Sequence, residues 1–191
     1  MILPILAYGD PILKKACKYV SKGQSGIKEL VENMFETMYE AEGVGLAAPQ
    51  VSESIRLFIM DSASIIMRDY PDEESVVRVF INPEILEEDD NDVVFNEGCL
   101  SIPLVREDVK RMSRIRIKYW EEDFVTHEEE FDGMNARIVL HEYDHVEGIL
   151  FTDHLSPLKK RLLKNQLADI TRGNIDIHYK MKFPLKKKVR R

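Results

Sequence analysis

The sequence from residue 141 to residue 145 reads His-Glu-Tyr-Asp-His. In a helix, residues four positions apart lie one turn apart on the same face, so His141 and His145 can both reach a single metal ion. Glu142 would then stand beside the ion without binding it, which is where a proton-transferring carboxylate is needed. An exposed helix rich in His and Glu would give the same pentapeptide, so the rest of the chain has to decide between the two interpretations.

The residues before and after this stretch predict that its helix is buried. Asp132 is a suitable N-cap before the helix, and Gly148 is a suitable residue to end it. Apolar side chains at Met134, Ile138 and Leu140 precede the two histidines. We therefore expect the metal-binding helix to lie at the centre of the fold.

The hydrophobic pattern predicts further helices and strands around it. Helices are expected over residues 27–43 and 156–173. Strands are expected over residues 56–60, 76–81 and 115–119. Asn82-Pro83 would stop the strand at 76–81. A turn near residues 121–123 would lead into a partner strand. The sequence therefore predicts an α+β fold, with antiparallel β-sheets packed around a central metal-binding helix, an N-terminal helix and a C-terminal helix.

Composition predicts a single soluble domain of the cytoplasm. The chain has 191 residues, of which 44% are apolar, enough for one hydrophobic core. Two cysteines, Cys17 and Cys99, exclude a disulfide framework and suit a reducing compartment. No stretch approaches the ~20 apolar residues of a membrane span, and the N-terminus does not resemble a secretion signal.

The net charge of −7 is unevenly distributed along the chain. Residues 180–191 contain seven of the 27 basic side chains and no acidic one, so the first 179 residues carry a net charge of −14. We expect one catalytic domain at 1–179 and a basic C-terminal tail at 180–191. Such a tail suits a polyanionic partner, although it would also serve as a solubilising terminus.

Two histidines need at least one more protein ligand, while a catalytic site keeps a further position open. A thiolate at Cys99 is a soft donor that suits zinc or ferrous iron, but an inert buried thiol is the more usual role of an intracellular cysteine. The candidates for the third ligand are Glu147, Asp153, His154 and Cys99.

A third segment, from Gly43 to Gln50, reads Gly-Val-Gly-Leu-Ala-Ala-Pro-Gln. Its small residues would let the backbone of an extended peptide come close, and the Gln50 amide can donate to an oxyanion. Alone, the segment also fits a turn that ends a helix.

Together, three segments resemble the signature motifs of bacterial peptide deformylase. They are Gly43 to Gln50, Glu97-Gly-Cys-Leu-Ser101 and His141 to His145, in the order and at the spacing of that family. The resemblance implies an enzyme that removes the N-formyl group from the initiator methionine of nascent polypeptides and releases formate. It also implies that some members associate with the ribosome through a C-terminal extension, as residues 180–191 would do here.

The resemblance assigns roles to residues of this sequence. Cys99, His141 and His145 would hold the metal, ferrous iron in the family, which zinc, nickel or cobalt can replace. Glu142 would be the general base and acid, Gln50 and the Leu100 N–H would bind the oxyanion, and Gly45 would meet the substrate backbone.

The methionine side chain that the resemblance implies would need an apolar pocket beside the metal. The candidates for this pocket are Val44, Met134 and Ile138, and Gly43 is a further candidate for binding the substrate. Arg137 would wall the pocket or support a neighbouring carboxylate. Three positions depart from the family pattern, namely Ser52, Leu104 and Val146.

Two other interpretations remain open at this point. One is a related metallohydrolase, such as a peptidase built on the same helix. The other is a binding protein in which the basic tail dominates and the metal is structural. A structural site has four protein ligands, and the sequence offers three convincing ones, which favours catalysis.

Overall fold

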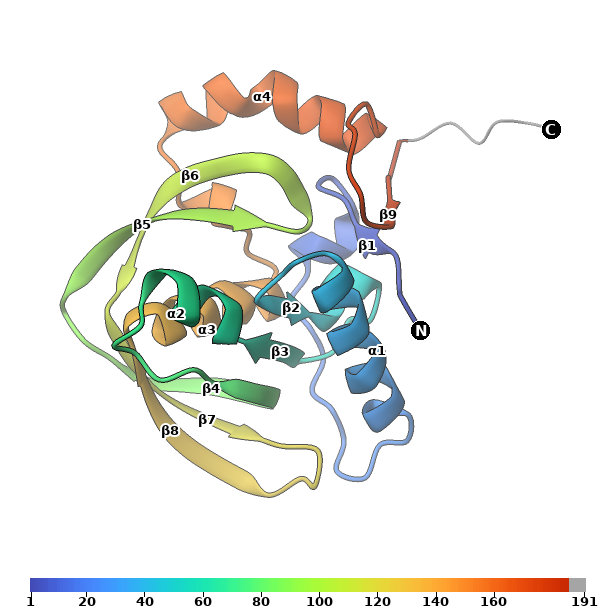
Figure 1. The fold of residues 1–191 in the computed structure, drawn as a ribbon. Helices are drawn as coiled ribbons and strands as arrows, with labels where there is room; N and C mark the ends of the chain where they lie inside the picture. Colours follow the sequence, from blue (N-terminus) through green and yellow to red (C-terminus); the bar gives the residue numbers. More distant parts are fainter. Residues whose placement is uncertain (186–191) are drawn as a thin grey trace.

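Helix α3 (Gly133–Val146), which carries the His-Glu-Tyr-Asp-His stretch, lies in the middle of the fold (Figure 1). This is a computed structural model, and it describes residues 1–185. Most residues of α3 are buried, including Ala136 and Val139, which are fully inaccessible. Apolar residues point from this helix toward sheets and helices on several sides, so it forms the centre of the core.

A five-stranded antiparallel sheet packs against α3. Its strands follow the order β2-β3-β4-β7-β8, with bounds β2 (Gly45–Ala47), β3 (Leu57–Asp61), β4 (Val77–Glu88), β7 (Arg114–Trp120) and β8 (Thr126–Asp132). In β7 the side chains of Ile115, Ile117 and Tyr119 are buried, whereas those between them are not. This alternation is that of a strand with one face on the core, as predicted for residues 115–119.

Strand β4 does not stop at Asn82-Pro83, so the prediction for its end was wrong. The strand continues to Glu88 because a bulge, seen as a register shift between Ile81 and Glu84, absorbs the proline. Asn82 has a φ of 52°, and its side chain exchanges two hydrogen bonds with the backbone of Val20, each 2.8 Å long. These bonds stabilise the unusual backbone conformation at Asn82, so the strand continues where the sequence alone predicts that it stops.

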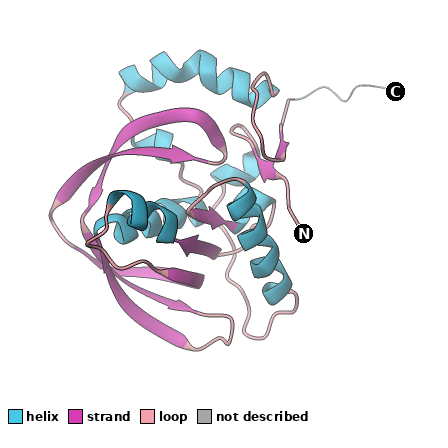
Figure 2. Ribbon diagram, in the orientation of Figure 1, coloured by secondary structure: helices cyan, strands magenta, loops and turns pink. Residues whose placement is uncertain are grey.

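A long hairpin, β5 (Asp92–Cys99) and β6 (Ile102–Met112), curves over α3 as a separate sheet (Figure 2). It was not predicted, because charged residues and Pro103 interrupt its pattern. Val105 and Val109 of β6 are buried in one apolar cluster with Leu163 and Leu167 of helix α4 (Pro157–Arg172). The hairpin ends at Cys99, so its pairing decides where the thiol lies.

The two outer helices were predicted correctly. They are α1 (Ile27–Glu40) and α4 (Pro157–Arg172). Ser156 caps α4 by accepting a bond from the Lys159 N–H, and Gly173 ends it in the left-handed region at a φ of 74°. The predicted α+β arrangement is confirmed. The remaining helices are α2 (Ala63–Asp69) and three short 3₁₀ turns, η1 (Pro11–Lys14), η2 (Ala48–Val51) and η3 (Phe151–His154).

After α4 the chain returns to the N-terminal segment. Strand β9 (Met181–Lys182) pairs in parallel with β1 (Ile5–Leu6). The beginning of the basic segment 180–191 is therefore part of the folded domain, while residues 186–191 lie outside the described residues. Among the helices of residues 1–185, none has the length and apolar character needed to cross a membrane.

Candidate metal centre and active site

Three donor side chains come together where β5 ends above α3. The ligand atoms of Cys99, His141 and His145 all lie within 4.8 Å of one another. The Cys99 sulfur is 3.2 Å from Nε2 of His145, and the two imidazole centroids are 5.1 Å apart. The helical spacing of the histidines and the turn of the β5–β6 hairpin thus bring Cys99 to two histidines that lie 42 and 46 positions later in the chain.

The other candidates for the third ligand are engaged elsewhere. Glu147 forms an ion pair with Arg56 at 2.6 Å. His154 lies 2.7 Å from a carboxylate oxygen of Asp144. Asp153 accepts a backbone N–H bond at the start of η3. Only Cys99 among the four contacts a histidine of the cluster.

Glu97, two residues before Cys99 on β5, orients His141. Its Oε2 lies 2.9 Å from Nδ1 of His141, which leaves Nε2 of that ring for the metal cluster. A carboxylate behind a ligating histidine fixes the ring and its tautomer. Glu97 belongs to one of the three motifs, but the sequence analysis assigned no role to it. Its position two residues before the cysteine was the available signal.

Two buried arginines hold Glu97 in turn. Arg111 donates to both carboxylate oxygens, at 2.7 and 3.1 Å, and Arg137 donates to one at 2.9 Å. Burial alone would raise the pKa of Glu97, but His141 and Arg111 outweigh it and hold the pKa well below its usual value. The prediction that Arg137 supports a carboxylate is confirmed. Arg111 has no local sequence signal, because the curvature of the hairpin creates its contact.

The charges of the cluster suit a divalent cation. Burial lowers the pKa of His141, but bonds with Cys99 and Glu97 outweigh burial and raise it to about 10. Burial and the charge on His141 lower the pKa of His145 well below its usual value, so His145 is a neutral imidazole. The site therefore favours positive charge beside the Cys99 sulfur and the Glu97 carboxylate. A sulfur and two ring nitrogens are a donor set that fits zinc or ferrous iron.

Glu142 faces the same cavity from α3. Only 5% of its surface is exposed, and among the described residues its Oε2 has no hydrogen-bond partner. Burial raises its pKa to about 7. Gly45 of β2 lies directly against this carboxylate, since a β-carbon built on Gly45 would meet Oε1. An unpartnered buried carboxylate near neutrality is suited to exchange protons with a bound molecule.

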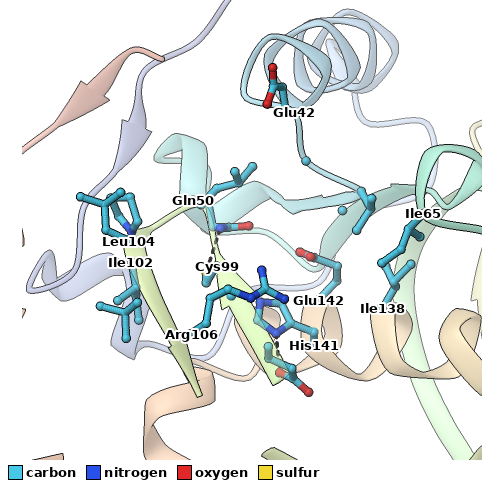
Figure 3. Close-up of a pocket in the computed structure, with 18 of the residues that line it drawn as sticks. Glu42, Gln50, Ile65, Cys99, Ile102, Leu104, Arg106, Ile138, His141 and Glu142 are labelled. Carbon is cyan, nitrogen blue, oxygen red and sulfur yellow. Dashed lines mark hydrogen bonds and ion pairs between the residues drawn. The ribbon is translucent and has the colours of Figure 1, made fainter. Parts of the chain in front are cut away.

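Gln50 is held so that its amide nitrogen points toward the cluster (Figure 3). Its Oε1 accepts the Ala47 N–H at 2.8 Å, so Nε2 faces Ser101 Oγ at 3.1 Å and the Cys99 sulfur at 3.6 Å. Leu100 follows the cysteine and lines the same cavity. The structure thus brings both predicted oxyanion-binding residues to the cluster.

A cavity of about 620 Å³ opens beside these side chains. The four residues predicted to bind the substrate, Gly43, Val44, Met134 and Ile138, all line it. Phe95 and Ile65 extend its apolar side, and neither was singled out from the sequence. Charged residues that also line it are Glu42, Arg68, Arg106 and Asp176.

The positions that depart from the family pattern have different structural consequences. Ser52 and Leu104 adopt φ angles of 75° and 64°, in the left-handed region that favours glycine. The backbone therefore keeps the conformation of a glycine although a side chain is present. Val146 is fully buried in the core around α3.

Comparisons with known proteins show which proteins this chain is similar to. A family model described as polypeptide deformylase matches residues 2–161. The peptide deformylase of Christiangramia forsetii is 52% identical over 196 residues, and the match covers 100% of both chains. The peptide deformylase of Cytophaga hutchinsonii is 51% identical, and the match covers 98% of this chain and 100% of the other. The structure of peptide deformylase from Thermotoga maritima has a TM-score of 0.73 at 42% identity, covering 82% of this chain and 99% of that one. For the Ehrlichia chaffeensis peptide deformylase the TM-score is 0.82 at 29% identity, covering 91% and 99%.

Proposed function

Because the chain belongs to the polypeptide deformylase family, we propose that it carries out the reaction of that family in the cavity beside Cys99, His141 and His145. The chain is a hydrolase that removes the N-formyl group from nascent polypeptides. In the reaction the oxygen of water joins the formyl carbon, the carbon–nitrogen bond breaks, and formate and a free amine are released.

The clustering of three donor atoms within 4.8 Å is the observation that carries the proposal. Cys99, His141 and His145 hold one divalent metal ion, with ferrous iron as the native ion and zinc, nickel or cobalt able to replace it. When bound, the ion would polarise the formyl carbonyl and lower the pKa of a water molecule. Three protein ligands leave coordination free for the reactants, as catalytic sites do.

Glu142 moves the proton. Its carboxylate takes a proton from the attacking water and passes it to the leaving amine, which requires a group able to exist in both forms near neutral pH. The pKa of about 7 and the unpartnered Oε2 support this role. The contact with Gly45 also supports this role, because a side chain at residue 45 would collide with the Glu142 carboxylate.

Gln50 and Leu100 stabilise the negative charge that develops on the formyl oxygen. The Gln50 amide is fixed by its bond from Ala47, so it does not need to reorganise during the reaction. The Leu100 N–H is the second donor. Removing one such donor typically costs about 100–1,000-fold in rate.

The substrate peptide lies along Gly43 to Gly45, with its methionine side chain in the apolar part of the cavity. Val44, Met134 and Ile138 line that part. Arg137 closes it without an unpaired charge, because its guanidinium bonds to Glu97 and to the Val109 carbonyl. A formyl carbon bears only hydrogen, so a narrow site at the metal would exclude larger acyl groups.

Formate release from a formyl-methionyl peptide by anaerobically prepared protein tests the function. Glu142→Gln is expected to lower kcat by at least about 100-fold while the protein still holds its metal. Glu130→Gln, at an exposed position of β8, serves as a control and keeps normal kcat. Activity that persists in Glu142→Gln would overturn the assignment of the proton carrier.

A ribosomal partner is a further part of the proposal. We expect the enzyme to work in the cytoplasm, where the nascent polypeptides that are its substrates are made. Residues 186–191, which read Lys-Lys-Lys-Val-Arg-Arg, would follow ribosomal RNA phosphates electrostatically. The division into a catalytic domain and this basic tail stays a prediction.

A further inference from the structure

The segment that follows α4 forms part of the wall of the catalytic cavity. From Asp176 to Tyr179 every residue lines the cavity that also contains Gln50, Cys99 and His141. The chain then enters β9 and pairs with β1, close to the N-terminus (Figure 1). Residues 174–182, called here the return segment, thus run from α4 past the site to β1.

Tyr179 makes the direct link between the return segment and the site. Its hydroxyl donates to the carbonyl oxygen of Leu100 at 2.8 Å. The ring is partly buried and packs in the same core cluster as Leu100. The next residue after the metal-binding cysteine is therefore held by a side chain that is 79 positions away.

A second bond fixes the next carbonyl along the chain. The Tyr8 N–H donates to Ser101 O at 2.8 Å. Tyr8 directly follows the stretch in which Ile5 and Ala7 donate to Lys180 O and Lys182 O, at 2.9 and 3.0 Å. Tyr179 of the return segment and Tyr8, just after β1, therefore hold two consecutive carbonyls, those of Leu100 and Ser101.

The turn at residues 99–102 depends on these outside bonds. The β5–β6 register shifts between Gly98 and Cys99, so regular strand pairing ends there. Leu100 is also in close contact with the substrate-facing segment, since a β-carbon on Gly43 would lie 2.8 Å from Leu100 Cδ1. A rotation of the Leu100 backbone would thus disturb the contact with Gly43 and move the N–H that is proposed to bind the oxyanion.

We propose that Tyr179 is a positioning residue for deformylation, whose hydroxyl fixes the Leu100 backbone so that the Leu100 N–H is held ready for the developing oxyanion. This inference rests on the oxyanion role proposed for Leu100. Small displacements of groups that act in the transition state have large effects on rate and small effects on ground-state binding. Tyr179 therefore acts on kcat rather than on KM.

Tyr179→Phe tests the proposal because it removes one oxygen and keeps the ring. The expected result is a fall in kcat of about 10-fold, with KM changed by less than about twofold. The metal content is expected to be unchanged, as is the visible spectrum of the cobalt-loaded protein, which reports the Cys99 sulfur. Tyr119→Phe is the matched control. It removes a buried hydroxyl that donates to Glu129 at 2.7 Å, away from the cavity, and should leave kcat and KM as they are.

Three results would overturn the proposal. They are an unchanged kcat in Tyr179→Phe, a rise in KM alone, and a loss of kcat that is explained by lost metal or an altered cobalt spectrum. Glu142→Gln, measured in parallel, separates this from a failure of the proposed function. If Glu142→Gln is inactive and Tyr179→Phe is fully active, the function stands and the positioning role is wrong.

Discussion

Gly45 and Glu142 are packed so closely that a β-carbon on Gly45 would lie 2.5 Å from Oε1 of Glu142. The contact joins β2 to α3 across the cavity, and both residues line it. The carboxylate therefore keeps its place because the neighbouring strand has no side chain at this position. Proton transfer by Glu142 should therefore depend on the absence of a side chain at Gly45.

Gly45→Ala should lower kcat by about 10-fold or more, because the added methyl group displaces the Glu142 carboxylate. Formate release measures kcat, and metal analysis verifies that the cluster is filled. Gly26→Ala is the control. Gly26 has a φ of 82° and open space around it, so its substitution strains the backbone and lowers stability without changing kcat. Normal kcat in Gly45→Ala would contradict the assigned contact.

Glu97→Gln should weaken metal binding by about 10–100-fold, because Glu97 orients His141 and raises its basicity. It should also lower the free energy of unfolding by about 3–5 kcal/mol, since Arg111 and Arg137 would lose their buried counter-charge. Competition with a chelator measures the affinity, and urea unfolding measures the stability. Glu107→Gln, which removes a part-exposed partner of Lys159, should change neither by a comparable amount. Equal metal affinity in Glu97→Gln and the wild type would refute this role.

Glu129, which contacts Arg78 and Tyr119 on the sheet, should make the stability of the protein depend on pH. Burial raises the pKa of Glu129, but hydrogen bonds from Arg78 and Tyr119 outweigh burial and lower the pKa below 4.5. A carboxyl group with a lowered pKa stabilises the fold above its unfolded pKa, and this contribution is lost as the pH falls through the folded pKa. Glu129→Gln should therefore be less stable than the wild type at pH 7, by about 1 kcal/mol.

The difference between Glu129→Gln and the wild type should shrink as the pH falls below 4.5, the usual value for this group. Urea unfolding at a series of pH values measures it. A difference that stays constant from pH 7 to pH 3 would show that the charge of Glu129 has no part in stability.

Removal of residues 186–191 should weaken binding to ribosomes by about 10-fold or more at low salt, because five basic side chains are lost. β9 ends at Lys182, so this deletion leaves its pairing with β1 in place. Co-sedimentation at two salt concentrations measures the binding, and kcat on a free peptide should be unchanged. If binding and its salt dependence are the same with and without these residues, the tail is not the contact.

Local patterns were sufficient for the three long helices and for the motif residues. The spacing of apolar residues predicted α1, α3 and α4, and the three motifs predicted the donors that the fold gathers. Neither Arg111 nor Tyr179 could be found in this way. Their contacts with Glu97 and Leu100 depend on the curvature of the hairpin and on the path of the return segment, which no local pattern encodes.

Strand β4 shows a different limit of sequence interpretation. Asn82-Pro83 is a reliable signal for a break in most strands, because proline cannot donate to the ladder. Here the side chain of Asn82 binds the backbone of Val20, a partner 62 positions earlier. The tertiary contact overrides the local preference.

The pairing of β1 with β9 determines when the active site can form during synthesis on the ribosome. The ribosome makes Met181 176 positions after its partner Ile5. Until then β1 has no strand beside it, the Tyr179 hydroxyl is missing from Leu100, and one wall of the cavity does not exist. A protein that acts on chains still under synthesis thus completes its own working site only after its residue 182 has been made.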